Sequence, residues 1–432
     1  MLNKIKNNIF LKSTLVLLIG GVIGKLVGFI LKIIVTRKLG AEGMGLYSLL
    51  TPTSSLLSVI ATLSYPTALS KIISEKSSRT KTLFISIIPL SIIINFFIIL
   101  ITILIAPTLS KLLKNEILYY PIICLSLVTP FISISSIIKG YFWGKQNMFP
   151  YMLSNFIEQI TRLILITLFI DKFLSISLIH TISFIILINA IGEVISQLVM
   201  MYFFPKNIKP SINDFNKNDI KKVMDICIPS TSSKIIGSIS YFLEPIILTN
   251  VLMYAGYSKD FIVYEYGVIN AYAMSLLLMP QFFTQNMATS LVPELSKYYS
   301  LGNKEMCKKR IKQIVLISCS IGGFSTLIIT LFPTFFLNIL YHTSLGLDYI
   351  RLLSPFTILF YIEYPLINAL QALGKSKRAM KCTIISSIVR LISISLLSLL
   401  KIGMYSLILS IIINLLLSTY LYSKEIKKVL SN

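Results

Sequence analysis

The chain has few of the residues on which most soluble enzymes rely. Of its 432 residues only 13% are charged, 17 are acidic, two are histidines and five are cysteines. The cysteines are scattered with a spacing that suits neither a metal site nor a disulfide framework. The sequence contains no Walker loop, catalytic triad or cluster of metal ligands. These absences argue against an enzyme, against ATP-driven transport by this chain alone, and against a bound cofactor.

What the chain has in abundance is apolar sequence. Hydrophobic residues make up 55% of it and the mean hydropathy is +0.81, whereas soluble domains have a charged fraction of about a quarter. Apolar runs between charged segments predict an all-α polytopic membrane protein with twelve transmembrane helices. The predicted spans are 13–35, 46–70, 83–106, 117–138, 150–170, 174–204, 223–252, 264–292, 313–340, 347–372, 379–400 and 403–422.

The lysines and arginines predict the orientation of these spans. Most of the 40 basic residues fall in the segments on one side of the membrane if the N-terminus is placed in the cytoplasm, as the positive-inside rule requires. The sequence therefore predicts a multi-pass protein of the cell membrane with both termini cytoplasmic. This topology signal also accounts for the net charge of +23, so the charge does not predict a nucleic-acid partner.

Several short motifs recur at a nearly constant spacing, which indicates a duplication. Leu49-Leu50-Thr51-Pro52 recurs as Leu277-Leu278-Met279-Pro280, Gly144-Lys145 as Gly374-Lys375, and Arg162 as Arg390. The spacing places the first span on the seventh, so the repeats are parallel. We expect an N-terminal six-helix lobe at 1–204, a cytoplasmic linker at 205–222 and a C-terminal six-helix lobe at 223–432. Two such lobes predict a V-shaped transporter with its site between them, near the bilayer midplane.

Three segments also carry a family resemblance. They are LGAEGMGLY at 39–47, PTALSK at 66–71, and KGYFWGKQNM at 139–148 followed by EQITR at 158–162. Together they resemble the stage V sporulation protein B branch of the multidrug/oligosaccharidyl-lipid/polysaccharide flippase superfamily. The resemblance implies translocation of an undecaprenyl-linked saccharide, a peptidoglycan precursor such as lipid II, for the spore envelope. Many members have fourteen spans, and arginine is expected at positions 25 and 32, where this chain has lysine; lysine keeps the charge but binds phosphate less specifically.

The first span carries two lysines, Lys25 and Lys32, on one helix face. A cation at mid-bilayer costs at least ~2.5–3.5 kcal/mol, so such a pair is expected to face a water-filled cavity that favours an anion. The alternative for Lys32 is to extend its ammonium to the outer interface.

Further polar residues lie on other predicted spans. Lys234, Tyr241 and Glu244 lie on the seventh, Ser54 on the second and Gln285 on the eighth. We expect Lys25 and Lys234, one from each lobe, to meet the diphosphate of a lipid-linked sugar, while the hydroxyl and amide side chains contact the saccharide. The alternatives are that Lys234 pairs with Glu244 and that the uncharged groups hydrogen-bond between helices.

The remaining intramembrane charges suggest ion pairs or coupling to an ion gradient. Glu158 and Arg162 have the spacing of an ion pair within one helix, and Arg390, the repeat counterpart of Arg162, has Glu363 as a possible partner. Glu193, Glu244 and Glu363 are the candidates for binding a coupling proton or sodium ion. The energy source is then a proton or sodium gradient, or the membrane potential.

The sequence as a whole predicts a monomeric flippase in which two lobes rock about a cationic cavity. Its expected partners are the lipid bilayer, the lipid-linked saccharide and, as candidates, cell-wall synthesis enzymes. A multidrug or metabolite antiporter is the alternative, although exporters of organic cations need acidic cavities and the first span offers lysines. A non-transporting membrane scaffold for envelope synthesis is the third possibility, but a scaffold has no need of buried cations.

Overall fold

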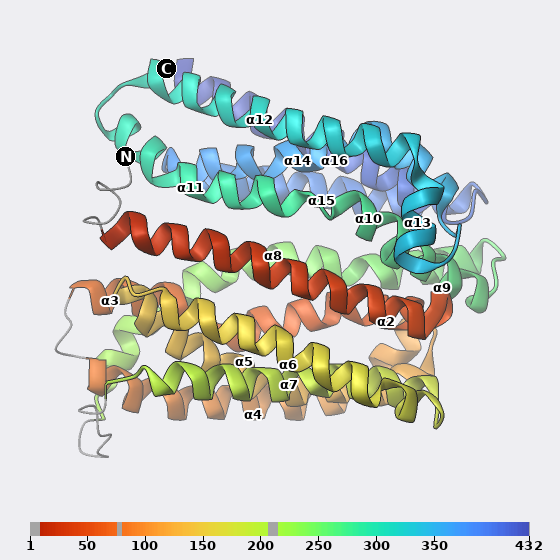
Figure 1. The fold of residues 1–432 in the computed structure, drawn as a ribbon, viewed down its shortest axis with the longest axis horizontal. Helices are drawn as coiled ribbons and strands as arrows, with labels where there is room; N and C mark the ends of the chain where they lie inside the picture. Colours follow the sequence, from red (N-terminus) through yellow and green to blue (C-terminus); the bar gives the residue numbers. More distant parts are fainter. Residues whose placement is uncertain (1–8, 76–79, 206–214, 432) are drawn as a thin grey trace. The chain divides into compact units, whose positions relative to one another are not determined.

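A computed structural model of the chain describes residues 9–75, 80–205 and 215–431. In these ranges all regular structure is helical (Figure 1). The helices of the first half are α2 (Ile9–Thr62), α3 (Tyr65–Glu75), α4 (Thr80–Leu112), the short 3₁₀ turn η2 (Glu116–Leu118), α5 (Tyr119–Gly144), α6 (Phe149–Leu174) and α7 (Leu178–Tyr202). Those of the second half are α8 (Lys217–Tyr254), α9 (Lys259–Gly267), the π-helical turn η4 (Val268–Ala273), α10 (Met274–Leu278), α11 (Gln281–Ser300), α12 (Lys304–Leu331), α13 (Pro333–Tyr341), α14 (Leu347–Ala372), α15 (Ser376–Leu399) and α16 (Tyr405–Ser431).

Among the described residues, 10 helical stretches are long and apolar enough to cross a membrane. They correspond to the third through twelfth spans predicted from the sequence, and the chain is a multi-pass membrane protein. The first two predicted spans, 13–35 and 46–70, fall on α2 and α3. The predicted fold class is confirmed, and the count of twelve stays a prediction.

The long helix α2 contains a sharp break at Gly40. The backbone there has φ 64° and ψ −171°, a conformation that is accessible in practice only to glycine. The break lies at the start of the 39–47 segment, where the sequence predicted the turn between the first two spans. A second break follows at Leu63 and Ser64, which both have positive φ, and α3 begins directly after it.

By its internal contacts the chain forms two compact units. Unit 1 comprises residues 1–38 and 50–242, and unit 2 comprises residues 39–49 and 243–432. The predicted division into six-helix lobes stays a prediction, and residues 206–214 of the predicted linker lie outside the described residues.

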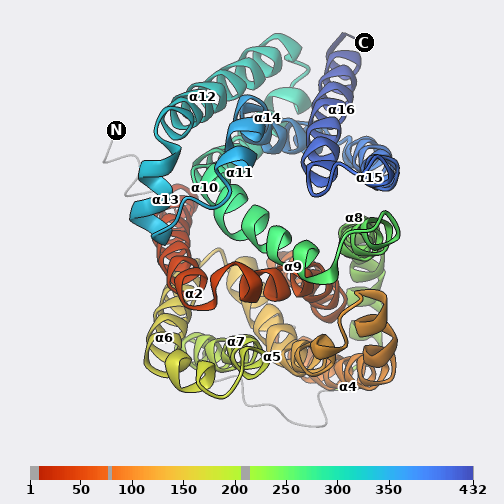
Figure 2. The same ribbon diagram turned by 90° about the vertical axis from the view of Figure 1, so that its right-hand side faces the viewer.

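In unit 1 the helix α5 lies at the centre of a bundle. It packs against α3, α4 and α7, and α6 packs against α7 (Figure 2). One buried cluster joins α3, α4, α5 and α8 through residues such as Tyr65, Leu83, Phe142 and Cys227. This bundle fixes α6 and α7 side by side, and the buried Glu158 and Glu193 lie on these two helices.

In unit 2 the helix α14 takes the central place and packs against α11, α12 and α16. A close helix crossing joins α9 to the 39–49 segment of α2. A Cβ atom added to Gly45 would lie 1.9 Å from the Val263 carbonyl oxygen, and one added to Gly267 would lie 1.9 Å from the Ala41 carbonyl oxygen. Only glycine allows backbones to approach so closely, so two glycines hold this segment against α9.

The outer faces of both units are apolar. Phe96, Leu104, Phe324 and Leu396 are all more than 60% exposed. Large apolar side chains exposed in such numbers mark a surface that is not in contact with water. They are the lipid-facing positions of the spans.

Candidate functional site

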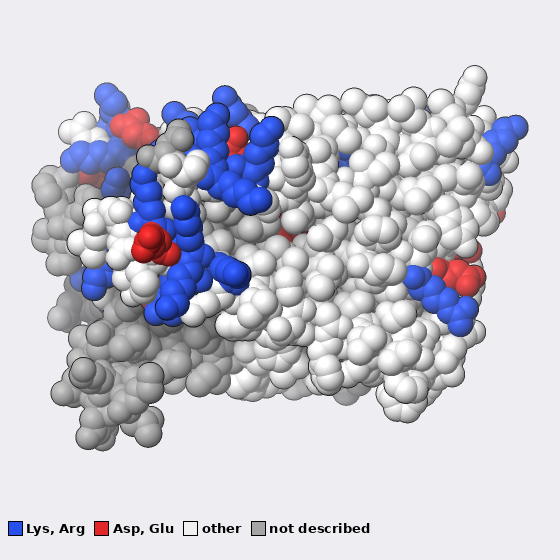
Figure 3. Space-filling model, turned by 90° about the horizontal axis from the view of Figure 1, so that it is seen from above, with Lys and Arg blue, Asp and Glu red and all other residues white. Residues whose placement is uncertain are grey.

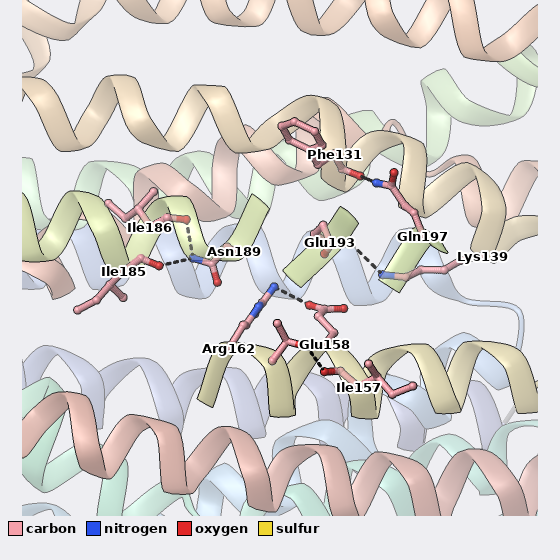
Figure 4. A network of polar contacts seen from close by, with 11 residues as sticks. Phe131, Lys139, Ile157, Glu158, Arg162, Ile185, Ile186, Asn189, Glu193 and Gln197 are labelled. Atoms are coloured by element: carbon pink, nitrogen blue, oxygen red, sulfur yellow. Dashed lines mark hydrogen bonds and ion pairs between the residues drawn. The ribbon is translucent and has the colours of Figure 1, made fainter. Parts of the chain in front are cut away.

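A cluster of buried charges in unit 1 lies between α6 and α7 (Figure 4). Arg162 Nη2 is 2.5 Å from Glu158 Oε1, and the Glu158 side chain is only 4% exposed. On α7, Glu193 Oε2 lies 4.0 Å from the Nζ atom of Lys139, which belongs to α5. Glu158 and Glu193 are also close enough to interact electrostatically. The structure thus brings two carboxylates and two cations together inside the bundle, as buried charges require.

A glycine makes the room for this cluster. Gly192 lies on α7 next to Glu193, and an added Cβ there would lie 2.8 Å from Arg162 Nε and 3.2 Å from Glu158 Cγ. The Arg162 guanidinium therefore lies directly against the backbone of α7. The sequence predicted the acids and Arg162 as intramembrane charges, but not the parts played by Gly192 and Lys139. The one available signal was a glycine directly before an intramembrane acid.

Two amides beside the cluster bind backbone carbonyl groups (Figure 4). Asn189 Nδ2 donates to the carbonyl oxygens of Ile185 and Ile186, at 3.2 and 3.0 Å. Gln197 Nε2 donates to the Phe131 carbonyl oxygen of α5 at 2.7 Å. The Gln197 bond joins α7 to α5, whereas both Asn189 bonds lie within α7. The acids and bases remain the ionisable groups of the site.

The helix α2 reaches α6 through a row of glycines. Added Cβ atoms at Gly20, Gly24 and Gly28 would contact Met152, Asn155 and Gln159 in turn, at 1.9, 2.8 and 3.5 Å. The two helices therefore run in the same direction, with one turn of α2 matched to about one turn of α6.

This register shows at which level along α6 the two lysines of α2 lie. Lys32 lies one turn beyond Gly28 and hence at about the level of Arg162, while Lys25 lies at about the level of Asn155. Lys25 is exposed and Lys32 is half-buried, and both have interactions with other groups. Unit 1 thus holds one cation of α2 at the depth of Arg162 and a second about one turn before Glu158.

The structure distributes the other predicted residues over both units. Ser54 is half-buried, and Lys234 and Tyr241 are exposed; all three belong to unit 1, as does Lys25. Gln285 is half-buried and belongs to unit 2.

Unit 2 has a buried ion pair of its own, centred on Arg390 of α15. Arg390 Nη2 lies 2.8 Å from Glu244 Oε2, and the Glu244 side chain is 6% exposed. Glu363 on α14 interacts with Arg390 electrostatically. Glu244 is thus engaged by Arg390, the interhelical partner that the sequence analysis did not foresee, in place of the alternative pairing with Lys234.

The arginines that are equivalent by the repeat therefore occupy similar surroundings. Arg162 and Arg390 each make an ion pair with a nearly buried glutamate, and each has a second glutamate nearby or on a neighbouring helix. In the part of the chain that the structure describes, there is no group of three or more His, Cys, Asp or Glu residues placed to hold a metal ion. The chemistry available here is charge pairing, proton exchange and the binding of anions by lysine.

Comparisons with known proteins give consistent results. A family model described as "Polysaccharide biosynthesis protein" matches residues 10–299, and a second, MatE, matches residues 245–396. Stage V sporulation protein B of Bacillus subtilis is 29% identical over 98% of this chain and 84% of its own length. The lipid II flippase MurJ of the same organism is 23% identical over 88% of this chain and 76% of its own.

A solved structure shares the fold. It is the inward-facing form of a multidrug resistance MATE family transporter of the MOP superfamily, with a TM-score of 0.78 over 94% of this chain and 95% of that one. The sequences are 16% identical, so the likeness concerns the fold. The family resemblance predicted from the three sequence segments is confirmed.

Proposed function

The chain belongs to the polysaccharide biosynthesis protein family, and on that premise we propose that it is a membrane flippase for a polyprenyl-diphosphate-linked saccharide. The observation that carries the proposal is the position of Lys25 and Lys32. Both lie on α2, which packs closely against α6: Lys32 is at about the level of Arg162 of the buried ion pair, and Lys25 is about one turn before Glu158. Cations held at that depth fit the diphosphate of a lipid-linked sugar, and they oppose the entry of organic cations.

The substrate we infer is a peptidoglycan precursor such as lipid II. Two curated relatives support this choice: one is named a stage V sporulation protein and the other a lipid II flippase. The head group would bind to the lysines while the polyprenyl tail stays in lipid, and rocking of the lobes would release the head group on the other side. The protein acts as a transporter, and not as an enzyme. It resides in the cytoplasmic membrane with both termini inside, and it serves spore-envelope synthesis.

A proton gradient, a sodium gradient or the membrane potential supplies the energy in this proposal. Glu193, Glu244 and Glu363 are the acids that we propose to bind a coupling ion. Glu193 lies 4.0 Å from Lys139, Glu244 pairs with Arg390, and Glu363 interacts electrostatically with Arg390, so neutralising any of them would change the charge balance on a cation. No cofactor takes part.

The test is translocation of fluorescent lipid II in proteoliposomes. Lys25→Gln and Lys32→Gln should each reduce the rate at least tenfold, whereas Lys25→Arg and Lys32→Arg should retain it because arginine keeps the charge. Lys111→Gln, an exposed lysine at the end of α4, is the matched control and should transport normally.

Three results would decide against parts of the proposal. Normal transport by both glutamine variants would make the lysines structural. Transport of another polyprenyl-diphosphate saccharide, and not of lipid II, would change the substrate and keep the mechanism. Efflux of ethidium by the intact protein, with no transport of any lipid-linked sugar, would replace the flippase with the antiporter.

A further inference from the structure

Lysine and arginine side chains gather at one end of unit 2 (Figure 3). We call this surface the basic end patch. It is formed by the end of α11, the start of α12, the turn between α14 and α15, the start of α15 and the end of α16. Its basic residues are Lys297, Lys304, Lys308, Lys309, Arg310, Lys312, Lys375, Lys377, Arg378, Lys381, Lys424, Lys427 and Lys428.

The arginines of the patch are engaged in ion pairs, and exposed lysines remain. Arg310 Nε lies 2.9 Å from Glu294, and Arg378 Nη1 lies 3.0 Å from Glu425 Oε2. These two pairs use Glu294 of α11 and Glu425 of α16, and Glu305 in the first turn of α12 is a third acid beside the thirteen basic residues. The patch is therefore a surface of strong positive charge.

The patch rests on a packed core, so its geometry is fixed. Leu295, Cys307, Leu370, Cys382 and Tyr422, one from each of α11, α12, α14, α15 and α16, belong to one buried cluster beneath it. Two hydrogen bonds join the same helices: Ser296 Oγ donates to the Ala372 carbonyl oxygen at 3.0 Å, and the Thr383 and Tyr422 hydroxyls are 2.8 Å apart.

The decisive feature is that the lysines lie next to exposed apolar side chains on the same helix faces. On α16, residues at helical spacing run from Lys428 and Lys424 to Tyr420 and Leu416, which are 59% and 49% exposed. The Lys424 ammonium lies 5.8 Å from the centre of the Tyr420 ring. Charge therefore gives way to exposed apolar surface within one turn of the same helix face.

The other two outer helices show the same transition. On α15, Lys377 and Lys381 are followed on one face by Ile385, Ile388 and Ile392, which are about half exposed. On α12, Lys309 and Lys312 are followed by Leu316, which is 64% exposed. Three helices thus present lysines directly at the end of a lipid-facing stripe.

We propose that the basic end patch binds the head groups of anionic phospholipids. Such a lipid has a negative phosphate next to its acyl chains, and the three helix faces have ammonium groups next to exposed aliphatic side chains. Clusters of lysine beside membrane helices attract anionic head groups, and each added lysine strengthens the attraction by a comparable amount. A soluble acidic protein would use the charge alone, whereas the observed faces join charge and apolar surface within one turn.

A fluorescent reporter at position 420 detects the lipid at the patch. Trp143 is the single native tryptophan, so the patch reporter is the variant W143F/Y420W, in which the indole ring keeps the cation–π contact with Lys424. The protein is reconstituted in vesicles that contain brominated phosphatidylglycerol or brominated phosphatidylcholine, and quenching of fluorescence is compared. A second variant, W143F/L331W, is the distal reporter, because Leu331 is a lipid-facing residue at the opposite end of α12.

We expect phosphatidylglycerol to quench the patch reporter with about a fivefold preference over phosphatidylcholine, and the distal reporter with almost none. Removing three lysines, K381Q/K424Q/K428Q, should abolish the preference at the patch reporter. Removing three exposed lysines elsewhere, K111Q/K114Q/K401Q, should leave it unchanged. Size-exclusion chromatography of each variant verifies that it is folded.

Two outcomes would overturn the proposal. One is equal quenching of the patch reporter by both lipids, or a preference that survives the loss of the three patch lysines. The other is full competition by soluble glycerol 3-phosphate, which would make the patch a site for small anions. Both outcomes are independent of lipid II transport, which depends on Lys25 and Lys32.

Discussion

Gly192 on α7 lies directly against the guanidinium of Arg162 on α6. A Cβ atom at Gly192 would be 2.8 Å from Arg162 Nε, a distance at which the arginine or the helix has to move. The absence of one methyl group thus determines where the buried charge of unit 1 lies. It also allows α6 and α7 to pack closely beside Glu158.

Replacing Gly192 with alanine should therefore destabilise the protein even though alanine favours helix formation. Overpacking of this kind costs roughly 1–3 kcal/mol, and we expect the melting temperature in detergent to fall. The matched control is Gly237→Ala on α8, where an added Cβ meets no heavy atom within 4 Å. That change should be neutral or stabilising, because alanine is the better helix former. Equal effects at the two positions would show that the contact with Arg162 is unimportant.

The ion pair between Glu158 and Arg162 is expected to be costly to break from one side. Glu158→Gln leaves the Arg162 charge without its carboxylate in a nearly buried site, and loss of one partner of a buried pair costs about 3–5 kcal/mol. The double variant E158Q/R162Q removes both charges and should be more stable than either single variant. Thermal unfolding of the four proteins completes the cycle.

An exposed pair serves as the control for this cycle. Lys38 and Asp171 lie 2.6 Å apart with side chains 42% and 65% exposed, and Asp171→Asn should cost less than ~1 kcal/mol. Additive losses at Glu158 and Arg162 would mean that the two charges do not stabilise each other.

The sequence predicted those parts of the fold and the site that depend on local spacing. Apolar runs gave the spans, and the four-residue spacing gave the pair of Glu158 and Arg162. Contacts between helices that are distant in the chain could not be predicted from the sequence. Glu244 and Arg390 are far apart in the chain and meet only because α8 and α15 approach each other in unit 2.

The same limit applies to the glycines. Gly45, Gly192 and Gly267 are recognisable as special only when the neighbouring backbone or side chain is known. A glycine in a membrane helix has many uses, and its residue type does not reveal which helix it contacts. The interaction of Lys139 is likewise visible only in the structure, where its ammonium lies 4.0 Å from Glu193 Oε2.

The ion pair of unit 2 suggests a specific test of coupling. Glu363 interacts electrostatically with Arg390, which pairs with Glu244, so a change in the charge of Glu363 alters the electrostatic balance on Arg390. If Glu363 binds the coupling ion, Glu363→Gln should abolish the stimulation of lipid II transport by a pH or sodium gradient. Slow translocation of lipid II in the absence of a gradient should persist.

Glu265→Gln is the matched control for that experiment. Glu265 also lies in unit 2 and accepts a hydrogen bond of 2.6 Å from the Tyr349 hydroxyl, but it lies outside the proposed coupling set. This variant should still respond to the gradient. A response that survives in Glu363→Gln would leave Glu193 and Glu244 as the candidates.

The orientation of the chain can be tested at the two ends of α16. The helix runs from Tyr405 to Ser431 and is apolar enough to span, so Lys401 and Lys428 should lie on opposite sides of the membrane. The excess of basic residues predicts that Lys428 lies on the cytoplasmic side. On a background without the five native cysteines, a membrane-impermeant maleimide added to whole cells should label Lys401→Cys, and should label Lys428→Cys only after permeabilisation.

The two ends of α6 provide a second pair of positions, because Lys172 lies in its last turn and Lys145 lies just before its start. Lys172→Cys should be labelled in whole cells, as Lys401→Cys is. Lys145→Cys should be labelled only after permeabilisation, as Lys428→Cys is. Labelling of Lys428→Cys in intact cells would reverse the orientation, and the basic end patch would then face the outer leaflet.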